Sequence, residues 1–125
     1  MGLDQIFYKV KQKHNNKGIN GMGFMDIVEL QRKGEAEDIL WLRKEYEISE
    51  MIRDMKKKHD LSDIVIIERN ELKKIIEKYE DLIWEEEENK GYMIMVVRQL
   101  QLIDKLFDFE EYYLGYTECR IRRNK

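Results

Sequence analysis

A glycine motif near the N-terminus is the first feature of this sequence that indicates a binding site. Gly18, Gly21 and Gly23 are spaced as Gly-x-x-Gly-x-Gly, and the backbone N–H groups of such a loop can surround an anion. Basic side chains precede the motif at Lys9, Lys11, Lys13 and Lys17. A phosphate-binding fingerprint also requires a helix after the glycines, and we expect none here. A flexible hairpin loop is the simpler interpretation, and a site for a nucleotide-like ligand is the alternative.

The same lysines also have the composition of a site for single-stranded nucleic acid. Phe7 and Tyr8 lie beside them, and such sites combine cations that contact phosphates with rings that stack on bases. The basic C-terminal residues 120–125 extend the patch if the two termini are adjacent. The formal net charge of the chain is −3, however, and lysines also protect sheet edges from aggregation. The charge balance therefore disfavours nucleic acid as the partner.

Aromatic side chains of the kind that anchor protein interfaces are frequent in the C-terminal half. Trp84 lies at the edge of an apolar stripe, and Tyr112, Tyr113 and Tyr116 are clustered in sequence. These four residues are the candidate protein-binding residues. Trp41, in contrast, falls on an apolar helical stripe and is expected in the core.

Residues suited to catalysis or metal binding are few. The single cysteine, Cys119, excludes an intrachain disulfide, and with only His14 and His59 beside it a structural zinc site is not expected. No base accompanies Cys119, and the nearness of Ser62 to His59 in sequence does not make a triad. The acidic run at residues 85–88 lacks the spacing of a calcium loop. We therefore expect no catalytic residue, no metal and no cofactor.

The composition is typical of a cytoplasmic protein. Charged residues make up 39% of the chain, and the longest apolar run, Met93–Val97, is far shorter than the ~20 residues of a membrane span. No signal peptide is recognisable, because Asp4 and Lys9 interrupt the first residues. A lone cysteine fits a reducing compartment, and we expect no contact with a membrane.

The first part of the chain, residues 1–31, is expected to form a β-hairpin. Residues 3–11 alternate two sets of side chains and are rich in β-branched and aromatic types, which predicts a strand. Residues 12–23 contain the Asn and Gly of a loop. Residues 24–31 are then the second strand of the hairpin.

Amphipathic helices are expected at residues 35–58, 70–88 and 92–110, because apolar side chains recur there three and four positions apart. The β-branched run 64–67 is either a short strand or an extended connector. The apolar residues that these patterns assign to the core are Trp41, Ile48, Ile52, Leu72, Ile75, Ile76, Tyr79, Ile83, Val97, Leu100 and Phe107.

The expected fold class is α+β, with a small N-terminal hairpin or sheet packed on two or three amphipathic helices. A single domain, residues 1–125, suits the length, because two separate cores would each be too small to be stable. The tail 111–125 is ambiguous. Its residues 111–121 fit either a strand that pairs with the N-terminal one or a continued helix.

Several short motifs resemble a group of small proteins that phages and prophages encode. The chain opens with Met-Gly-Leu-Asp, carries the helix motif Leu-Trp-Leu-Arg-Lys at residues 40–44, and continues with Arg-Asn-Glu-Leu at residues 69–72. The cluster Phe109–Tyr113 is similar to an acidic-aromatic cluster of the group, whereas Leu42 stands where the group has Trp. The group has no assigned activity, so the resemblance implies only the context of a phage or prophage accessory protein.

We expect a non-catalytic accessory protein that binds a host or phage protein, for instance to inhibit a host system, in the cytoplasm of the host cell. One alternative is a protein that binds or sequesters a small nucleotide-like ligand, and another is a nucleic-acid-binding module. Self-association is expected in addition if Met93 and Met95 lie on an exposed face.

Overall fold

The chain folds into two compact units, and each is described on its own. The computed structural model describes residues 2–12, 22–88 and 90–121. One unit contains the residues up to Ile67 and from Phe109 onward, and the other is Glu68–Asp108. Within the described ranges, no helix is both long and apolar enough to cross a lipid bilayer.

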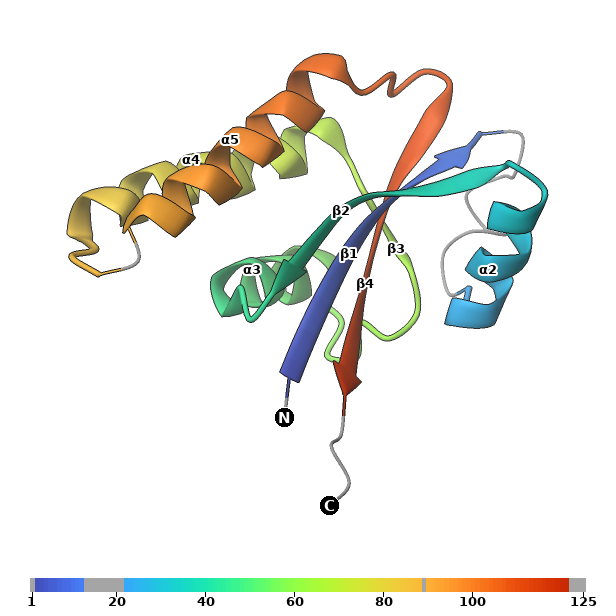
Figure 1. Ribbon diagram of the computed structural model, residues 1–125, viewed down its shortest axis with the longest axis horizontal. Coiled ribbons are helices and arrows are strands. Elements are labelled where there is room, and N and C mark those ends of the chain that lie inside the picture. The colour runs from blue at the N-terminus through green and yellow to red at the C-terminus, as the bar shows by residue number, and fades with distance from the viewer. Residues whose placement is uncertain (1, 13–21, 89, 122–125) are drawn as a thin grey trace. The chain divides into compact units, whose positions relative to one another are not determined.

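The first unit is built on an antiparallel sheet. Its elements are β1 (Gly2–Lys11), α2 (Phe24–Arg32), β2 (Ala36–Arg43), α3 (Tyr46–Lys56), β3 (Val65–Ile67) and β4 (Tyr112–Ile121). The strands pair in the order β2-β1-β4-β3, and each neighbouring pair is antiparallel (Figure 1). With the helices of both units, this sheet confirms the expected α+β class.

The central strands β1 and β4 pair along their whole length, from Gly2 opposite Ile121 to Lys11 opposite Tyr112. The predicted strand at residues 3–11 is therefore confirmed. For the ambiguous residues 111–121 the strand alternative is correct. The β-branched run 64–67 supplies the short strand β3, because its residues 65–67 pair with β4 rather than acting as a connector.

The residues predicted as the second strand of a hairpin, 24–31, form helix α2 instead. The N–H of Gly23 donates to Oδ2 of Asp26 at 3.1 Å, which stabilises the first helical turn. Gly34, with a φ of +73°, takes the left-handed conformation that commonly ends a helix. The N-terminal cap and Gly34 favour a helix. The apolar run at residues 24–31 is too short for its periodicity to distinguish a strand from a helix.

The predicted helix 35–58 is wrong over its first part. Residues 36–43 form strand β2, and α3 begins only at Tyr46. Lys44 separates the two elements with a left-handed φ of 58°. The strand is stabilised by pairing with β1, a partner distant in sequence that local periodicity does not reveal. The aromatic and Arg-Lys motif of the resemblance thus lies on a strand and its end, not on a helix.

The expected core position of Trp41 is also wrong. Leu40 and Leu42 are buried on one face of β2, whereas Trp41 lies on the other face and is 56% exposed. Its indole Nε1 donates to Oδ2 of Asp38 at 3.0 Å. Side chains alternate across a strand, so the ring that a helix would have turned inward points outward here.

Both faces of the sheet bury apolar side chains. On the face that α2 covers, the α2 face, the core cluster is Ile6, Tyr8, Val10, Ile27, Leu30, Ala36, Ile64 and Ile66. Gly115 of β4 belongs to this face, and a Cβ there would overlap the side chain of Ile64, so the close packing requires glycine. On the opposite face, the α3 face, the rings of Phe7 and Tyr116 lie 5.0 Å apart between centroids.

The second unit is a helical hairpin of α4 (Arg69–Glu85) and α5 (Lys90–Leu106), close to the helices predicted at 70–88 and 92–110. Asp104 on α5 accepts from Arg69 Nε and Lys73 Nζ on α4, each at 3.3 Å, and so ties the two helices together. The core residues confirmed as buried here are Leu72, Ile75, Ile76, Tyr79, Val97 and Leu100, while Ile83 and Phe107 are half-buried.

Candidate functional site

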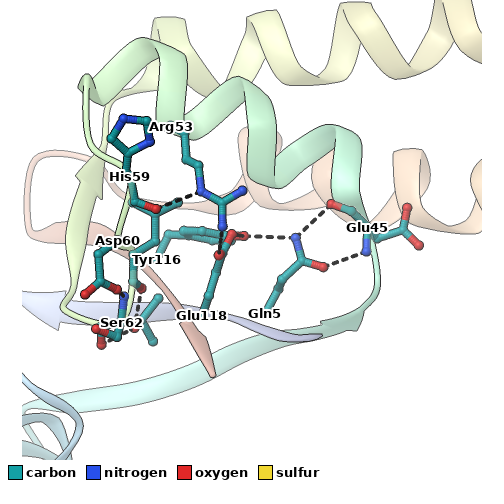
Figure 2. A network of polar contacts seen from close by, with 10 residues as sticks. Gln5, Glu45, Arg53, His59, Asp60, Ser62, Tyr116 and Glu118 are labelled. Carbon is teal, nitrogen blue, oxygen red and sulfur yellow. Dashed lines mark hydrogen bonds and ion pairs between the residues drawn. The ribbon is translucent and has the colours of Figure 1, made fainter. Parts of the chain in front are cut away.

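A buried polar network joins three elements of the first unit on the α3 face. The amide Nε2 of Gln5 on β1 donates to the backbone oxygen of Glu45 and to the hydroxyl of Tyr116, each at 2.9 Å (Figure 2). The amide Oε1 accepts from the N–H of Glu45 at 2.7 Å. Glu45 directly precedes α3, so these bonds fix the start of that helix on the sheet.

Glu118 is a buried carboxylate with both oxygens engaged. Its Oε2 accepts from the hydroxyl of Tyr116 at 2.6 Å, and its Oε1 accepts from the guanidinium of Arg53 on α3 at 3.2 Å (Figure 2). Arg53 Nε also donates to the backbone oxygen of His59 at 2.9 Å. Because an unpaired buried charge is costly, these contacts are what permits a carboxylate at this depth. They tie α3 and the segment after it to β4.

Tyr116 is not the surface anchor that the sequence predicts. Its side chain is fully buried, and its hydroxyl bridges the Gln5 amide and the Glu118 carboxylate. Burial, followed by the negative charge of Glu118, raises the pKa of this hydroxyl above its usual range. The hydroxyl therefore remains a neutral donor at physiological pH, and its role is to hold the network together.

A cleft of about 600 Å³ opens beside this network. It is lined by Ile6, Arg53, His59, Asp60, Leu61, Ser62, Thr117, Glu118 and Cys119. The wall at residues 61–62 is held to β4, because the hydroxyl of Thr117 and the N–H of Glu118 both donate to the backbone oxygen of Leu61, at 3.0 and 2.8 Å. The volume lies within the range of small-molecule pockets.

The cleft is lined by both Cys119 and His59, a thiol and an imidazole that the sequence gave no reason to combine. Both side chains are exposed, and within the described residues neither group makes a hydrogen bond. The pKa of Asp60 is lowered, chiefly because the N–H of Ser62 donates to its carboxylate at 3.0 Å. A thiol without an oriented base lacks the geometry of an activated nucleophile.

The lysine and glycine site predicted near the N-terminus is not assembled among the described residues. The Nζ of Lys9 lies 3.6 Å from the Glu37 carboxylate and 4.5 Å from the centroid of the Tyr112 ring, so an acid and a ring already accompany this cation. Lys11 is exposed on the last residue of β1. The remaining lysines and glycines of that prediction, Lys13, Lys17, Gly18 and Gly21, lie outside the described residues.

The glycine motif is followed by a helix, contrary to expectation, since Gly23 directly precedes α2. The strands on its two sides, β1 and β2, are nevertheless antiparallel neighbours. A dinucleotide-binding fingerprint requires parallel strands joined through the helix, so this order of elements does not provide one.

Of the four predicted protein-binding residues, Trp84 is the most exposed, at 83%. Tyr112 and Tyr113 are half-buried, and Tyr113 packs against the core cluster of the α2 face. On the hairpin, Trp84 and Arg98 line a groove of about 430 Å³ between α4 and α5.

The hairpin carries a further apolar surface, of which the sequence analysis named only Met95, as a site of self-association if exposed; Met95 is 47% exposed and Met93 is half-buried. Four large side chains of α5 are exposed, at positions separated by three, seven and four residues. This spacing places them on one side of the helix, and we call them the α5 stripe: Tyr92, Met95, Leu102 and Leu106. The apolar spacing of the stripe is visible in the sequence. Val96 and Leu100, however, belong to a second apolar row on the same helix that also fits a core face. Only the packing shows which of the two rows is buried.

Two cations border the α5 stripe on one side. Arg98 lies one helical turn from both Met95 and Leu102, and Lys105 lies one turn from Leu102. In the part of the chain that the structure describes, neither cation has an ion-pair partner. Arg98 also lines the groove that contains Trp84, so it connects the two apolar surfaces of the hairpin.

No cluster of three or more potential ligands for a metal ion occurs among the described residues. Comparison of the chain with protein-family models, with curated proteins and with solved structures found no match. The geometry of the cleft and of the hairpin surface is therefore the basis for inferring a function.

Proposed function

We propose that this chain is a non-catalytic binding protein and that the helical hairpin α4–α5 holds its protein partner. The observation that carries the proposal is the exposure of the α5 stripe, whose side chains are 40% to 70% exposed. Grouped apolar side chains of this size on a protein surface mark interaction sites more often than chance. Trp84 adds an aromatic anchor of the type that dominates protein interfaces.

The partner that fits this surface is a different protein that presents an apolar helix flanked by carboxylates. Apolar stripes of this kind pack against an amphipathic helix of the partner. Acidic flanks would pair with Arg98 and Lys105, which lack partners of their own among the described residues. A second copy of α5, packed antiparallel on the first, would instead bring these cations together, so the stripe disfavours self-pairing.

The resemblance to phage and prophage proteins supplies the biological setting of the proposal. In that setting the chain is an accessory protein, the partner is a host or phage protein in the cytoplasm of the host cell, and binding inhibits a host system. This setting requires no catalytic residue of the chain.

Affinity capture from nuclease-treated host lysate tests the proposal when charge-matched variants are compared. Arg98→Glu reverses the charge beside the stripe, and Lys74→Glu makes the same change at an exposed position of α4. We expect one protein captured by the wild type and by Lys74→Glu, and lost with Arg98→Glu and with Leu102→Glu. Equal capture by all four forms, or no captured protein, would overturn the proposal.

A second candidate function is the binding of a small polar ligand, and the specific observation that favours it is the cleft at Cys119 and His59. A ligand of the folded state raises the melting temperature by mass action and would shield the thiol from alkylation. A panel of nucleotides, scored by melting temperature and by the rate of Cys119 alkylation, tests this. If no nucleotide of the panel changes the melting temperature or the rate of Cys119 alkylation, nucleotides are rejected as the ligand class.

A further inference from the structure

The two edges of the sheet are unequal. One edge is β3, which is only three residues long, and short edge strands are a common protection against unwanted pairing. The other edge is β2, which has eight residues. Among the described strands, β1 alone pairs with β2. A long edge strand of this kind is a ready template for pairing with another chain.

The backbone of β2 offers free hydrogen-bonding groups at this edge. The N–H of Lys44 donates to the oxygen of Leu3 at 2.9 Å, which makes these two residues a hydrogen-bonded pair of the β1–β2 ladder. Hydrogen-bonded and non-bonded pairs alternate in an antiparallel ladder. The N–H and C=O groups of Trp41 and Arg43 therefore point away from β1, toward the open edge.

The charges along β2 are ordered in a self-complementary way. Acidic side chains, Glu37 and Asp38, lie at its beginning, and basic side chains, Arg43 and Lys44, lie at and just after its end. An edge protected by charges of one sign repels a second copy of itself. Here an antiparallel second copy brings the acidic half of one strand opposite the basic half of the other, and such cross-strand pairs are favourable.

We propose that the β2 edge binds a second copy of this chain, strand against strand and antiparallel, with the two-fold axis at Trp41. In this register the exposed indoles of the two copies lie opposite each other. The β1–β2 register shifts between Phe7 and Tyr8, which leaves Ile39 unpaired as a bulge. Beyond that bulge, Asp38 lies opposite Arg43 of the partner subunit and Glu37 lies opposite Lys44 of the partner subunit.

This register satisfies the backbone and both faces of the sheet. Trp41 and Arg43 supply outward backbone groups, and Asp38 does so on the far side of the bulge, so each of these pairs can exchange two hydrogen bonds. Leu40 lies opposite Leu42 of the partner subunit, and both belong to the buried α3 face. The register also gives the 56% exposed Trp41 a covering partner. The proposal uses only the first unit and is independent of the hairpin surface.

Sedimentation velocity of the full chain, up to millimolar concentration, tests the proposal with a charge-reversal cycle. The variants are Glu37→Lys, Lys44→Glu, the double variant and the control Lys74→Glu. We expect a dimer of the wild type, a dissociation constant raised about tenfold by either single reversal at β2, and recovery in the double variant. The control should dissociate as the wild type does.

Three outcomes would overturn the proposal. The first is a monomer at every concentration, which would mean that the mixed charges protect the edge. The second is a dimer that neither single reversal weakens. The third is a double variant no better than the single ones, because only a direct contact between positions 37 and 44 of two copies predicts the rescue. Circular dichroism of each variant checks that the sheet is retained.

Discussion

The sheet unit and the α5 surface of the helical hairpin use cationic side chains in opposite ways, although Arg69 and Lys73 on α4 are paired with Asp104. In the sheet unit, Arg53 is paired with a buried carboxylate, Lys9 lies 3.6 Å from a carboxylate, and Arg43 lies 3.0 Å from Asp4. On the hairpin, Arg98 and Lys105 have no ion-pair partner among the described residues. These three cations of the sheet unit are engaged within the fold, whereas the two beside the α5 stripe remain available to another molecule.

The apolar side chains differ in the same sense. The sheet unit buries the rings of Phe7, Tyr8 and Tyr116, and the large apolar side chains that it exposes among its described residues lie singly on three different elements: Met25 on α2, Trp41 on β2 and Tyr46 on α3. The hairpin leaves Trp84 and the α5 stripe exposed. If the hairpin holds the partner as proposed, stability and partner recognition are separated along this chain. Substitutions in the network of the sheet unit should change the free energy of unfolding, and those on the hairpin surface should change binding.

The largest difference is expected between two arginines. Arg53→Ala leaves the buried Glu118 carboxylate without its cation and should lower the free energy of unfolding by about 3 kcal/mol. Arg98→Ala removes an exposed, unpaired cation and should change it by less than about 0.5 kcal/mol. Urea unfolding of both variants measures this, and equal effects would break the comparison.

Alkaline pH should destabilise the protein through Tyr8. Burial, followed by the charge of Asp38, raises the pKa of Tyr8 to about 12. The unfolded chain releases this proton near pH 10 and the folded chain retains it, so stability is unaffected below about pH 10 and falls as the pH rises toward 12. Tyr8 should account for about 2–3 kcal/mol of this loss, in addition to the part that the buried Tyr116 contributes through its own raised pKa. Urea unfolding at a series of pH values measures it, and a loss of the same size in Tyr8→Phe would disprove the assignment.

The same chemical change should have opposite signs on the two faces of the sheet. Tyr116→Phe removes a hydroxyl bonded to Gln5 and Glu118 and should cost about 2 kcal/mol. Tyr8→Phe removes a buried hydroxyl without a partner among the described residues and should stabilise by about 1 kcal/mol at neutral pH. Thermal unfolding of the two variants is the check, and effects of the same sign would contradict it.

The smallest change in stability is expected at the hairpin surface. Trp84→Ala removes a ring that is 83% exposed, so the free energy of unfolding should stay within about 0.5 kcal/mol of the wild type. The same variant should weaken capture of the protein partner. A large loss of stability would show that Trp84 supports the fold, and would remove it from the recognition surface.

Sequence periodicity is sufficient to predict those elements whose apolar pattern extends over many consecutive residues. The strand at β1 and the helices α4 and α5 were predicted because their apolar positions recur over many residues. At β2 the alternation of Leu40, Trp41 and Leu42 is brief, and it merges with the helical spacing of Ile48 and Ile52. The pairing with β1 decides the structure there, and that information is distant in sequence.

The candidate sites were harder to predict for the same reason. Gln5 and Tyr116 are 111 positions apart, and His59 and Cys119 meet at one cleft only because β4 returns beside the segment after α3. No local spacing carries such a relation. The exposure of Trp84 could be predicted from its place at the edge of a stripe, since an apolar side chain at such a boundary is easily left outside the core.

The most direct test of the central claim is site-specific photo-crosslinking in a cell of the proposed host. A photo-reactive amino acid replaces Leu106, the most exposed member of the α5 stripe at 70%, or Tyr46, which is 52% exposed on the sheet unit. We expect a discrete protein adduct from position 106 that Arg98→Glu abolishes, and no such adduct from position 46. An adduct from position 46 alone, or an adduct from position 106 that survives Arg98→Glu, would contradict the assignment of recognition to the hairpin.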